Sequence, residues 1–237
     1  IVPIALGMLW YPFLRRIGAR AMMFILALTV GLLVYLAIGT WLDANEFALE
    51  LPAFWQGVPL VIFIALLALG VLLAVGSVRK GQETPPLGIS YRIAMGIGLH
   101  NLGEGLAIGA AFALGEAALG TFLILGFTLH NITEGIGIVS PVVRKNPGLR
   151  HFLLLALISG GPAILGTWIG GFAFDPVLAT IFLAIGVGAI LQVVWEVSKL
   201  VARDSAKLGL PVINWVNLGG VVVGIALMYF TAFFVKF

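Results

Sequence analysis

The chain has 237 residues, of which 61% are hydrophobic and only 10% are charged. Its mean hydropathy is +1.15, a composition that excludes an ordinary soluble domain. There is no cysteine, so a disulfide framework and a thiolate metal site are both excluded, and any metal must be bound by nitrogen and oxygen atoms.

Long apolar segments follow one another along the chain and predict membrane spans. A helix needs about 20 apolar residues to cross roughly 30 Å of hydrocarbon, and uniform apolar runs satisfy their backbone groups only as helices. We therefore predict an all-α integral membrane protein, a single transmembrane domain over residues 1–237. Its eight transmembrane helices are predicted at residues 1–14, 21–42, 58–78, 93–115, 117–143, 152–174, 176–197 and 208–235.

The first predicted helix, residues 1–14, is shorter than the others. The chain opens on Ile1 rather than Met and lies at once in an apolar stretch. We therefore expect this helix to be truncated, and no cleavable signal peptide is visible.

Basic residues alternate between the predicted loops. The even-numbered loops have none, and the second holds Asp43, Glu46 and Glu50. We expect these three acids to lie in an acidic, solvated loop, the alternative being that they gather cations at the outer mouth. The positive-inside rule then predicts a multi-pass protein of the cell (inner or plasma) membrane, with the odd-numbered loops in the cytoplasm and both termini outside. Only Lys236 falls on the other side. The odd-numbered loops carry Arg15, Arg16 and Arg20; Arg79, Lys80 and Arg92; Arg144, Lys145 and Arg150; and Lys199, Arg203 and Lys207.

This even spread of basic residues also bears on partners. A nucleic-acid-binding protein gathers its basic residues on one face, whereas here they mark the membrane topology. We expect the lipid bilayer as a partner and no nucleic acid.

A short sequence repeat lies in the fourth and fifth predicted helices. Residues 96–108 read GIGLHNLGEGLAI and residues 126–138 read GFTLHNITEGIGI, with His, Asn and Glu at matching positions. Ionisable groups at membrane depth are costly and point to function. In each helix the His and the Glu, four residues apart, share one face, and the Asn lies at its edge. The six candidate metal ligands are His100, Asn101, Glu104, His130, Asn131 and Glu134.

The two repeat-bearing helices run in opposite directions, so each His is expected level with the Glu of the other helix. Imidazole, carboxylate and amide groups suit divalent zinc, iron, manganese, cobalt or cadmium. We therefore predict a metal site between the fourth and fifth helices and no resident cofactor. The glycines that flank the ligands are expected to let these two helices approach closely; they are Gly96, Gly103, Gly105, Gly126 and Gly135.

Three interpretations of these residues stay open. Buried His, Asn and Glu can simply join helices by hydrogen bonds, although six in a duplicated arrangement favour a metal site. A membrane-embedded metal-dependent hydrolase would use the same residues to activate water, but the HxxxE spacing differs from the HExxH of metalloproteases. We favour a transporter of divalent transition-metal ions, not an enzyme, that works by alternating access.

The repeated motif resembles that of the ZIP (Zrt/Irt-like) metal transporter family, in its bacterial, GufA-like branch. The resemblance rests on the HNxxEG element from His100 to Gly105 and its second copy from His130 to Gly135, and it extends over essentially the whole chain. It implies eight helices, a transport site between the fourth and fifth, and frequent dimerisation, so a homodimer is expected. It also implies uptake toward the cytoplasm of zinc above all, or of iron, manganese or cadmium.

One stretch departs from the family pattern. Many relatives carry a Glu-Pro pair in the sixth helix whose carboxylate bridges to a second metal, whereas this chain has Gly161 before Pro162. Since Gly161 has no side chain to offer, we predict one principal metal. Its primary ligands would be His100, Glu104, His130 and Glu134, with Asn101 and Asn131 secondary.

Three further residues carry smaller expectations. Glu196 precedes Lys199 by three residues, so we expect an ion pair on the helix surface, the alternative being that Glu196 lines the inner exit. Pro141 is expected to kink the fifth helix near its end. His151 borders a predicted loop, and we assign it no role.

Overall fold

The structure, a computed structural model, describes residues 1–77 and 85–235. Over these residues the chain is helical and has no β-strand, which confirms the all-α prediction. Three basic residues on which the topology argument draws, Arg79, Lys80 and Lys236, lie outside the described residues.

The helices follow the order of the predicted segments. The two shortest, α1 (Val2–Met8) and α2 (Tyr11–Leu14), together cover the first segment. The short 3-10 turns are η1 (Ala53–Trp55) and η2 (Ser140–Val142). The longer helices are α3 (Ala19–Leu49), α4 (Gly57–Ser77), α5 (Pro86–Ala113), α6 (Ala117–Val139), α7 (Leu149–Phe172), α8 (Pro176–Lys207) and α9 (Trp215–Val235).

Five of these helices, within the described part of the chain, are long and apolar enough to cross a membrane: α3, α4, α6, α7 and α8. The α1–α2 segment and α9 contain shorter apolar stretches. Helix α5 is long enough, but its buried His100, Asn101 and Glu104 lower its mean hydropathy. The helices are compatible with a multi-pass membrane protein.

Three helices run beyond the spans predicted from hydropathy. Asp43 and Glu46 lie on the last turns of α3, so their prediction as loop residues is wrong, and only Glu50 lies beyond the helix. Arg92 lies within α5 and Lys199 within α8, also outside any loop. Hydropathy marks where a helix leaves hydrocarbon, but backbone hydrogen bonds continue into water. What ends α8 is Gly209, whose φ of +66° suits glycine.

The proline of α6 ends the helix rather than kinking it. Helix α6 stops at Val139, and Pro141 lies in the 3-10 turn η2 that follows. Proline lacks the backbone N–H that the next helical turn would need, so the expected kink becomes a terminus.

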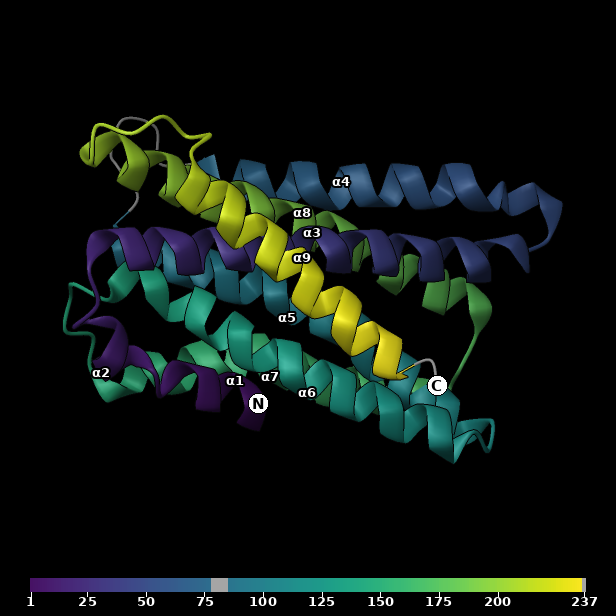
Figure 1. Ribbon diagram of the computed structural model, residues 1–237. Coiled ribbons are helices and arrows are strands. Elements are labelled where there is room, and N and C mark those ends of the chain that lie inside the picture. The colour runs from purple at the N-terminus through teal and green to yellow at the C-terminus, as the bar shows by residue number, and fades with distance from the viewer. Residues whose placement is uncertain (78–84, 236–237) are drawn as a thin grey trace.

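The long helices lie side by side in one bundle (Figure 1). Helix α5 packs mainly against α7 and α8, whereas α3 packs against α8 and α9. Helix α4 lies at the edge of the bundle and contacts α3 and α8 (Figure 1). The short α1 packs against α6 and α7. Helix α5 is therefore the central element, with neighbours on several sides.

Glycines set the close packing of α5 against α7. A Cβ atom built on Gly105 would lie 2.1 Å from the Ala163 carbonyl oxygen, and one on Gly166 would lie 2.0 Å from the Leu102 carbonyl oxygen. No side chain fits at such distances, so the two backbones touch directly. Small residues at an interface allow this kind of helix approach in membranes.

For four of the five flanking glycines, the predicted role in joining the two ligand-bearing helices is wrong. Gly96 and Gly103 face α8, Gly105 faces α7, and Gly135 faces α1 at the Ile4 carbonyl oxygen. The physical reason is that α5 and α6 meet through the polar side chains of the candidate site, which need space between the backbones. These four glycines instead pack the outer faces of both helices against their other neighbours.

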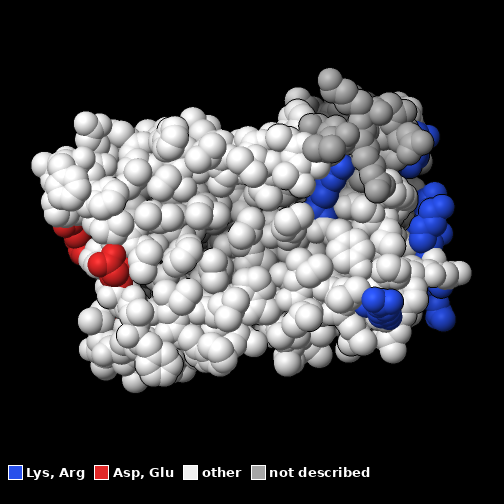
Figure 2. All heavy atoms as spheres, turned by 180° about the vertical axis from the view of Figure 1, so that it is seen from behind, with Lys and Arg blue, Asp and Glu red and all other residues white. Residues whose placement is uncertain are grey.

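Charge is separated along the bundle. Figure 2 shows acidic side chains at one end of the visible face and basic side chains at the other. The basic end is formed by the α2–α3 connection, the segment after η2 and the end of α8, which carry Arg15, Lys145 and Arg203. A span of largely uncharged surface separates the two ends, as expected for a protein whose middle lies in lipid.

Candidate metal centre

The six predicted ligands lie on two neighbouring helices. Helix α5 provides His100, Asn101 and Glu104, and α6 provides His130, Asn131 and Glu134. All six are buried, with exposed fractions of 1% to 9%. They therefore face the interior of the bundle rather than the lipid.

Glu104 is the centre of the hydrogen bonds between the two helices. Its Oε1 lies 2.9 Å from Nε2 of His100 and 2.6 Å from Nε2 of His130, so one carboxylate oxygen accepts from both imidazoles. The contact between His130 and Glu104 is the level pairing expected of antiparallel helices. A carboxylate that joins two imidazoles also fixes the orientation of both rings.

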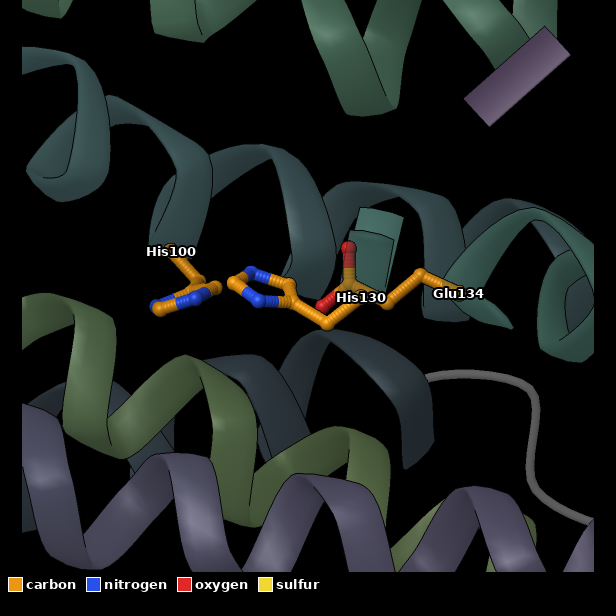
Figure 3. Close-up of side chains that lie close together, drawn as sticks. All are labelled: His100, His130 and Glu134. Atoms are coloured by element: carbon orange, nitrogen blue, oxygen red, sulfur yellow. The ribbon is translucent and has the colours of Figure 1, made fainter. Parts of the chain in front are cut away.

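His100, His130 and Glu134 form a compact group of possible metal ligands. One ligand atom from each lies within 4.8 Å of the others, and Figure 3 shows the three side chains converging from α5 and α6. Neither carboxylate oxygen of Glu134 has a hydrogen-bond partner, and Nδ1 of His100 has none either. Buried polar atoms are almost always paired, so these three are exceptions that need an explanation.

The two asparagines connect the group to its surroundings. Nδ2 of Asn101 donates to Oδ1 of Asn131 at 3.0 Å and to the Ser159 carbonyl oxygen at 2.9 Å. Nδ2 of Asn131 donates to Oε2 of Glu104 at 3.3 Å and to the Phe127 carbonyl oxygen at 2.7 Å. In this arrangement the asparagine amides position Glu104 and tie α5 to α7.

Residues 159–162 of α7, the stretch that differs from the ZIP pattern, contact the candidate site through a backbone carbonyl. The Ser159 carbonyl of α7 accepts the hydrogen bond from Asn101, a contact that residue types alone do not predict. Among the described residues, the atom nearest to a Cβ built on Gly161 would be Cδ1 of Leu157, at 3.6 Å. Gly161 has no side chain and supplies no metal ligand.

A cavity of about 90 Å³ adjoins the cluster. His100, Glu104 and Phe127 line it on the side of the cluster, and Asp43 of α3 lines it toward the acidic end. Asp43 was expected in a solvated loop. Its position on α3 instead brings a carboxylate to a space large enough for several water molecules, which reaches two of the candidate ligands.

Glu196 forms the expected pair with Lys199, at 2.9 Å, but not on the helix surface. Its side chain is 6% exposed, and its other oxygen lies 3.6 Å from Arg92 of α5. The contact between Arg92 and Glu196 therefore joins α5 to α8, while the Glu196–Lys199 pair lies within α8. His151, to which no role was assigned, lies 2.8 Å from the Tyr91 hydroxyl.

Gln192 is a buried polar residue that sequence reasoning missed. It lies on α8 with an exposed fraction of 2%, and its Oε1 has no partner. A Cβ built on Gly96, one turn before His100, would lie 2.7 Å from that oxygen. A single glutamine in a long apolar helix carries no motif, so only the packing of α5 on α8 reveals its place near the cluster.

Comparisons with known proteins do not identify this chain. No protein-family model matches its sequence, and no curated protein matches it. The chemistry of the buried cluster therefore carries the functional argument, and the resemblance of its HNxxEG motifs remains a proposal.

Proposed function

We propose that this chain is a transporter of divalent transition-metal ions, zinc above all, in which α5 and α6 hold the ion inside the membrane. One observation carries the proposal: Glu134 has two unpaired carboxylate oxygens in a buried position beside two imidazoles. An uncompensated buried charge is strongly destabilising. A divalent cation would supply the missing partner.

His100, His130, Glu104 and Glu134 would be the primary ligands of one ion. Two imidazole nitrogens and two carboxylate oxygens fit zinc, which accepts such ligands in tetrahedral geometry, and also cadmium, iron, manganese and cobalt. The two carboxylates would balance the charge of a divalent cation. Asn101 and Asn131 would keep the supporting role that their hydrogen bonds indicate.

Access to the cluster differs between its two sides. The cavity that reaches Asp43 supports an approach from the acidic end. Toward the basic end from the ligands, α5 and α6 carry the buried apolar side chains Ile97 and Ile138, and α8 contributes the buried Val193. A cluster open to one side and packed on the other fits alternating access, in which a rigid-body movement exchanges the open side.

The proposed direction of movement is uptake, as the resemblance to the ZIP family implies. With the basic end in the cytoplasm of the cell membrane and both termini outside, an ion that enters from the acidic end would then move inward. A divalent cation gains about 4.6 kcal/mol per 100 mV of membrane potential, twice the value for one elementary charge. That is enough to drive uptake without a nucleotide-hydrolysing domain.

The proposed topology has eight spans. Helices α3, α4, α6, α7 and α8 are five of them. The α1–α2 segment, α5 and α9 would be the others. Helix α5 can span the membrane despite its polar residues because these face the interior of the bundle. Membership of the ZIP family and a homodimeric assembly complete the proposal, both on the strength of the HNxxEG resemblance.

Liposomes that contain the purified protein test the transport proposal. They are expected to accumulate zinc, and the panel extends to cadmium, manganese, iron and cobalt. The variants Glu134→Ala and His130→Ala should reduce flux to the level of empty liposomes. The control variant Asn217→Ala, which changes a buried polar residue of another helix pair, should keep the flux of the parent protein. If all three variants transported zinc as fast as the parent protein, the cluster would not be the transport site. Cleavage of a substrate without net flux would instead indicate the membrane hydrolase.

A further inference from the structure

A second, larger cavity lies at the basic end of the bundle, apart from the metal cluster. Its volume is about 510 Å³, and none of the six candidate ligands lines it. The α2–α3 connection, the start of α5, the turn η2 with the segment after it, and the end of α8 form its walls. A volume between about 300 and 1,000 Å³ is typical of small-molecule sites, so this cavity is much larger than a bare metal ion needs.

The walls of this cavity are strongly cationic. Five basic side chains and one carboxylate line it: Arg15, Arg144, Lys145, Arg203, Lys207 and Asp204. Oδ1 of Asp204 accepts a hydrogen bond from Nζ of Lys207 at 2.8 Å and lies 3.7 Å from Nε of Arg203. The single carboxylate is therefore already engaged by the two basic residues of its own helix.

The other three basic residues come from the α2–α3 connection and from the segment after η2. In the part of the chain that the structure describes, no carboxylate pairs with Arg15, Arg144 or Lys145. Arg15 lies over the ring of Tyr11, 5.8 Å from its centroid, which leaves its positive charge in place. Three cations from two separate segments thus face one space, an arrangement that is repulsive unless an anion occupies it.

The floor of the cavity is apolar. Leu14, Leu26 and Leu200 line it, with exposed fractions of 2% to 4%. A low-dielectric floor strengthens the field of the cations above it. The same field would repel a divalent metal ion, so the cavity is not a second cation site.

We propose that this cavity binds a phosphate group, carried either by the headgroup of an anionic phospholipid or by soluble phosphate. Phosphate offers several strong acceptor oxygens and up to two negative charges, and arginine binds it through two parallel hydrogen bonds. Basic pockets between helices at the cytoplasmic membrane surface bind anionic headgroups. The proposal does not depend on metal transport, because it uses neither α6 nor any ligand of the cluster.

The test uses the full chain in a neutral detergent. Native mass spectrometry measures the affinity for dioleoyl phosphatidylglycerol, with dioleoyl phosphatidylcholine as the zwitterionic comparison, and inorganic phosphate is added as a competitor. Arg144→Gln with Lys145→Gln should weaken binding about 25-fold, because each basic residue near an anionic headgroup contributes about fivefold. The charge-matched control Arg16→Gln with Arg150→Gln removes two exposed basic residues that do not line the cavity. It should change the affinity less than about twofold.

A second variant tests whether binding needs the space of the cavity as well as its positive charge. Ala19 of α3 lines the cavity, and Ala19→Trp should occupy part of the cavity and weaken binding without altering any charge. Displacement of the lipid by millimolar inorganic phosphate would assign the site to soluble phosphate, and retention of the lipid would assign it to the headgroup. The proposal is overturned if neither ligand binds, if the control loses as much affinity as the cavity variant, or if Ala19→Trp binds as the parent protein does.

Discussion

Two buried polar clusters join helices in this protein, and they differ in what they leave unpaired. Between α8 and α9, Nδ2 of Asn217 donates to Oγ of Ser205 and to the Val212 carbonyl oxygen, each at 2.8 Å. Between α5 and α6, Glu104 joins two imidazoles while both oxygens of Glu134 stay without a partner. The first cluster consists of neutral groups, and its only unpaired atom is an amide oxygen.

The difference separates structural hydrogen bonding from a binding site. The amide and hydroxyl groups between α8 and α9 are neutral, and their hydrogen bonds stabilise the helix pair as interhelical hydrogen bonds usually do. The α8–α9 cluster therefore needs no ligand. An ionisable cluster with unpaired oxygens is poorly satisfied by the protein alone. That contrast favours a cation at α5 and α6, and it predicts that variants of the two clusters fail in different ways.

The largest effect is expected from Glu104→Gln. This change keeps the shape of the side chain but removes one of the two charges that would balance a divalent ion. Zinc affinity, measured by competition with a chelator, should fall at least about 100-fold, the lower end of the cost of breaking a buried charge pair. Glu196→Gln is the matched control, since Glu196 is an equally buried carboxylate that pairs with Arg92 and Lys199. An equal loss in both variants would contradict the assignment.

A smaller loss is expected from Asn131→Ala. Its amide donates to Oε2 of Glu104 and so positions a proposed ligand without being a primary one. Groups that orient a ligand typically contribute 10- to 100-fold to metal affinity. We expect zinc to bind about 10-fold or more weakly with the same stoichiometry of one ion per chain. A loss as complete as that of Glu104→Gln would make Asn131 a ligand instead.

Asn217→Ala should act on stability alone. The substitution leaves the buried Ser205 hydroxyl and the part-buried Val212 carbonyl without their partner, and one unsatisfied buried group costs about 1–3 kcal/mol. Equilibrium unfolding in mixed micelles should show a loss in that range, while zinc affinity stays within about twofold. A tenfold fall in zinc affinity would erase the distinction between the two clusters.

The smallest effect is expected at the start of α8. Oδ1 of Asp175 accepts from the backbone N–H of Val177 at 2.8 Å and of Leu178 at 3.1 Å, so it caps the helix. Asp175→Ala should cost about 1 kcal/mol in the same unfolding assay, the usual value of an N-cap. Asp175→Asn, which retains the acceptor oxygen, should recover most of it. No change in either variant would show that the cap contributes nothing.

Much of the candidate site was predictable from the repeat itself. The matching positions of His100 and His130, with a Glu four residues after each, were enough to predict that the side chains meet between two antiparallel helices. The spacing of four residues fixes the face of a helix wherever that helix lies.

The partners of each helix face were not predictable in this way. Gly105 was expected to face α6 and faces α7, because a glycine permits close approach without specifying the neighbour. Asp43 was expected in a loop, because hydropathy falls before the helix ends. Gln192 carries no motif, and only the packing of α8 against α5 brings it near His100.

The most direct test of the central claim is the X-ray absorption spectrum of the zinc-loaded protein at the zinc edge. The account predicts two imidazole ligands per zinc, with nitrogen and oxygen atoms at about 2.0–2.2 Å, and the loss of the imidazole signal in the double variant His100→Ala with His130→Ala. A zinc ion surrounded only by oxygen atoms, or an unchanged spectrum in the double variant, would contradict it.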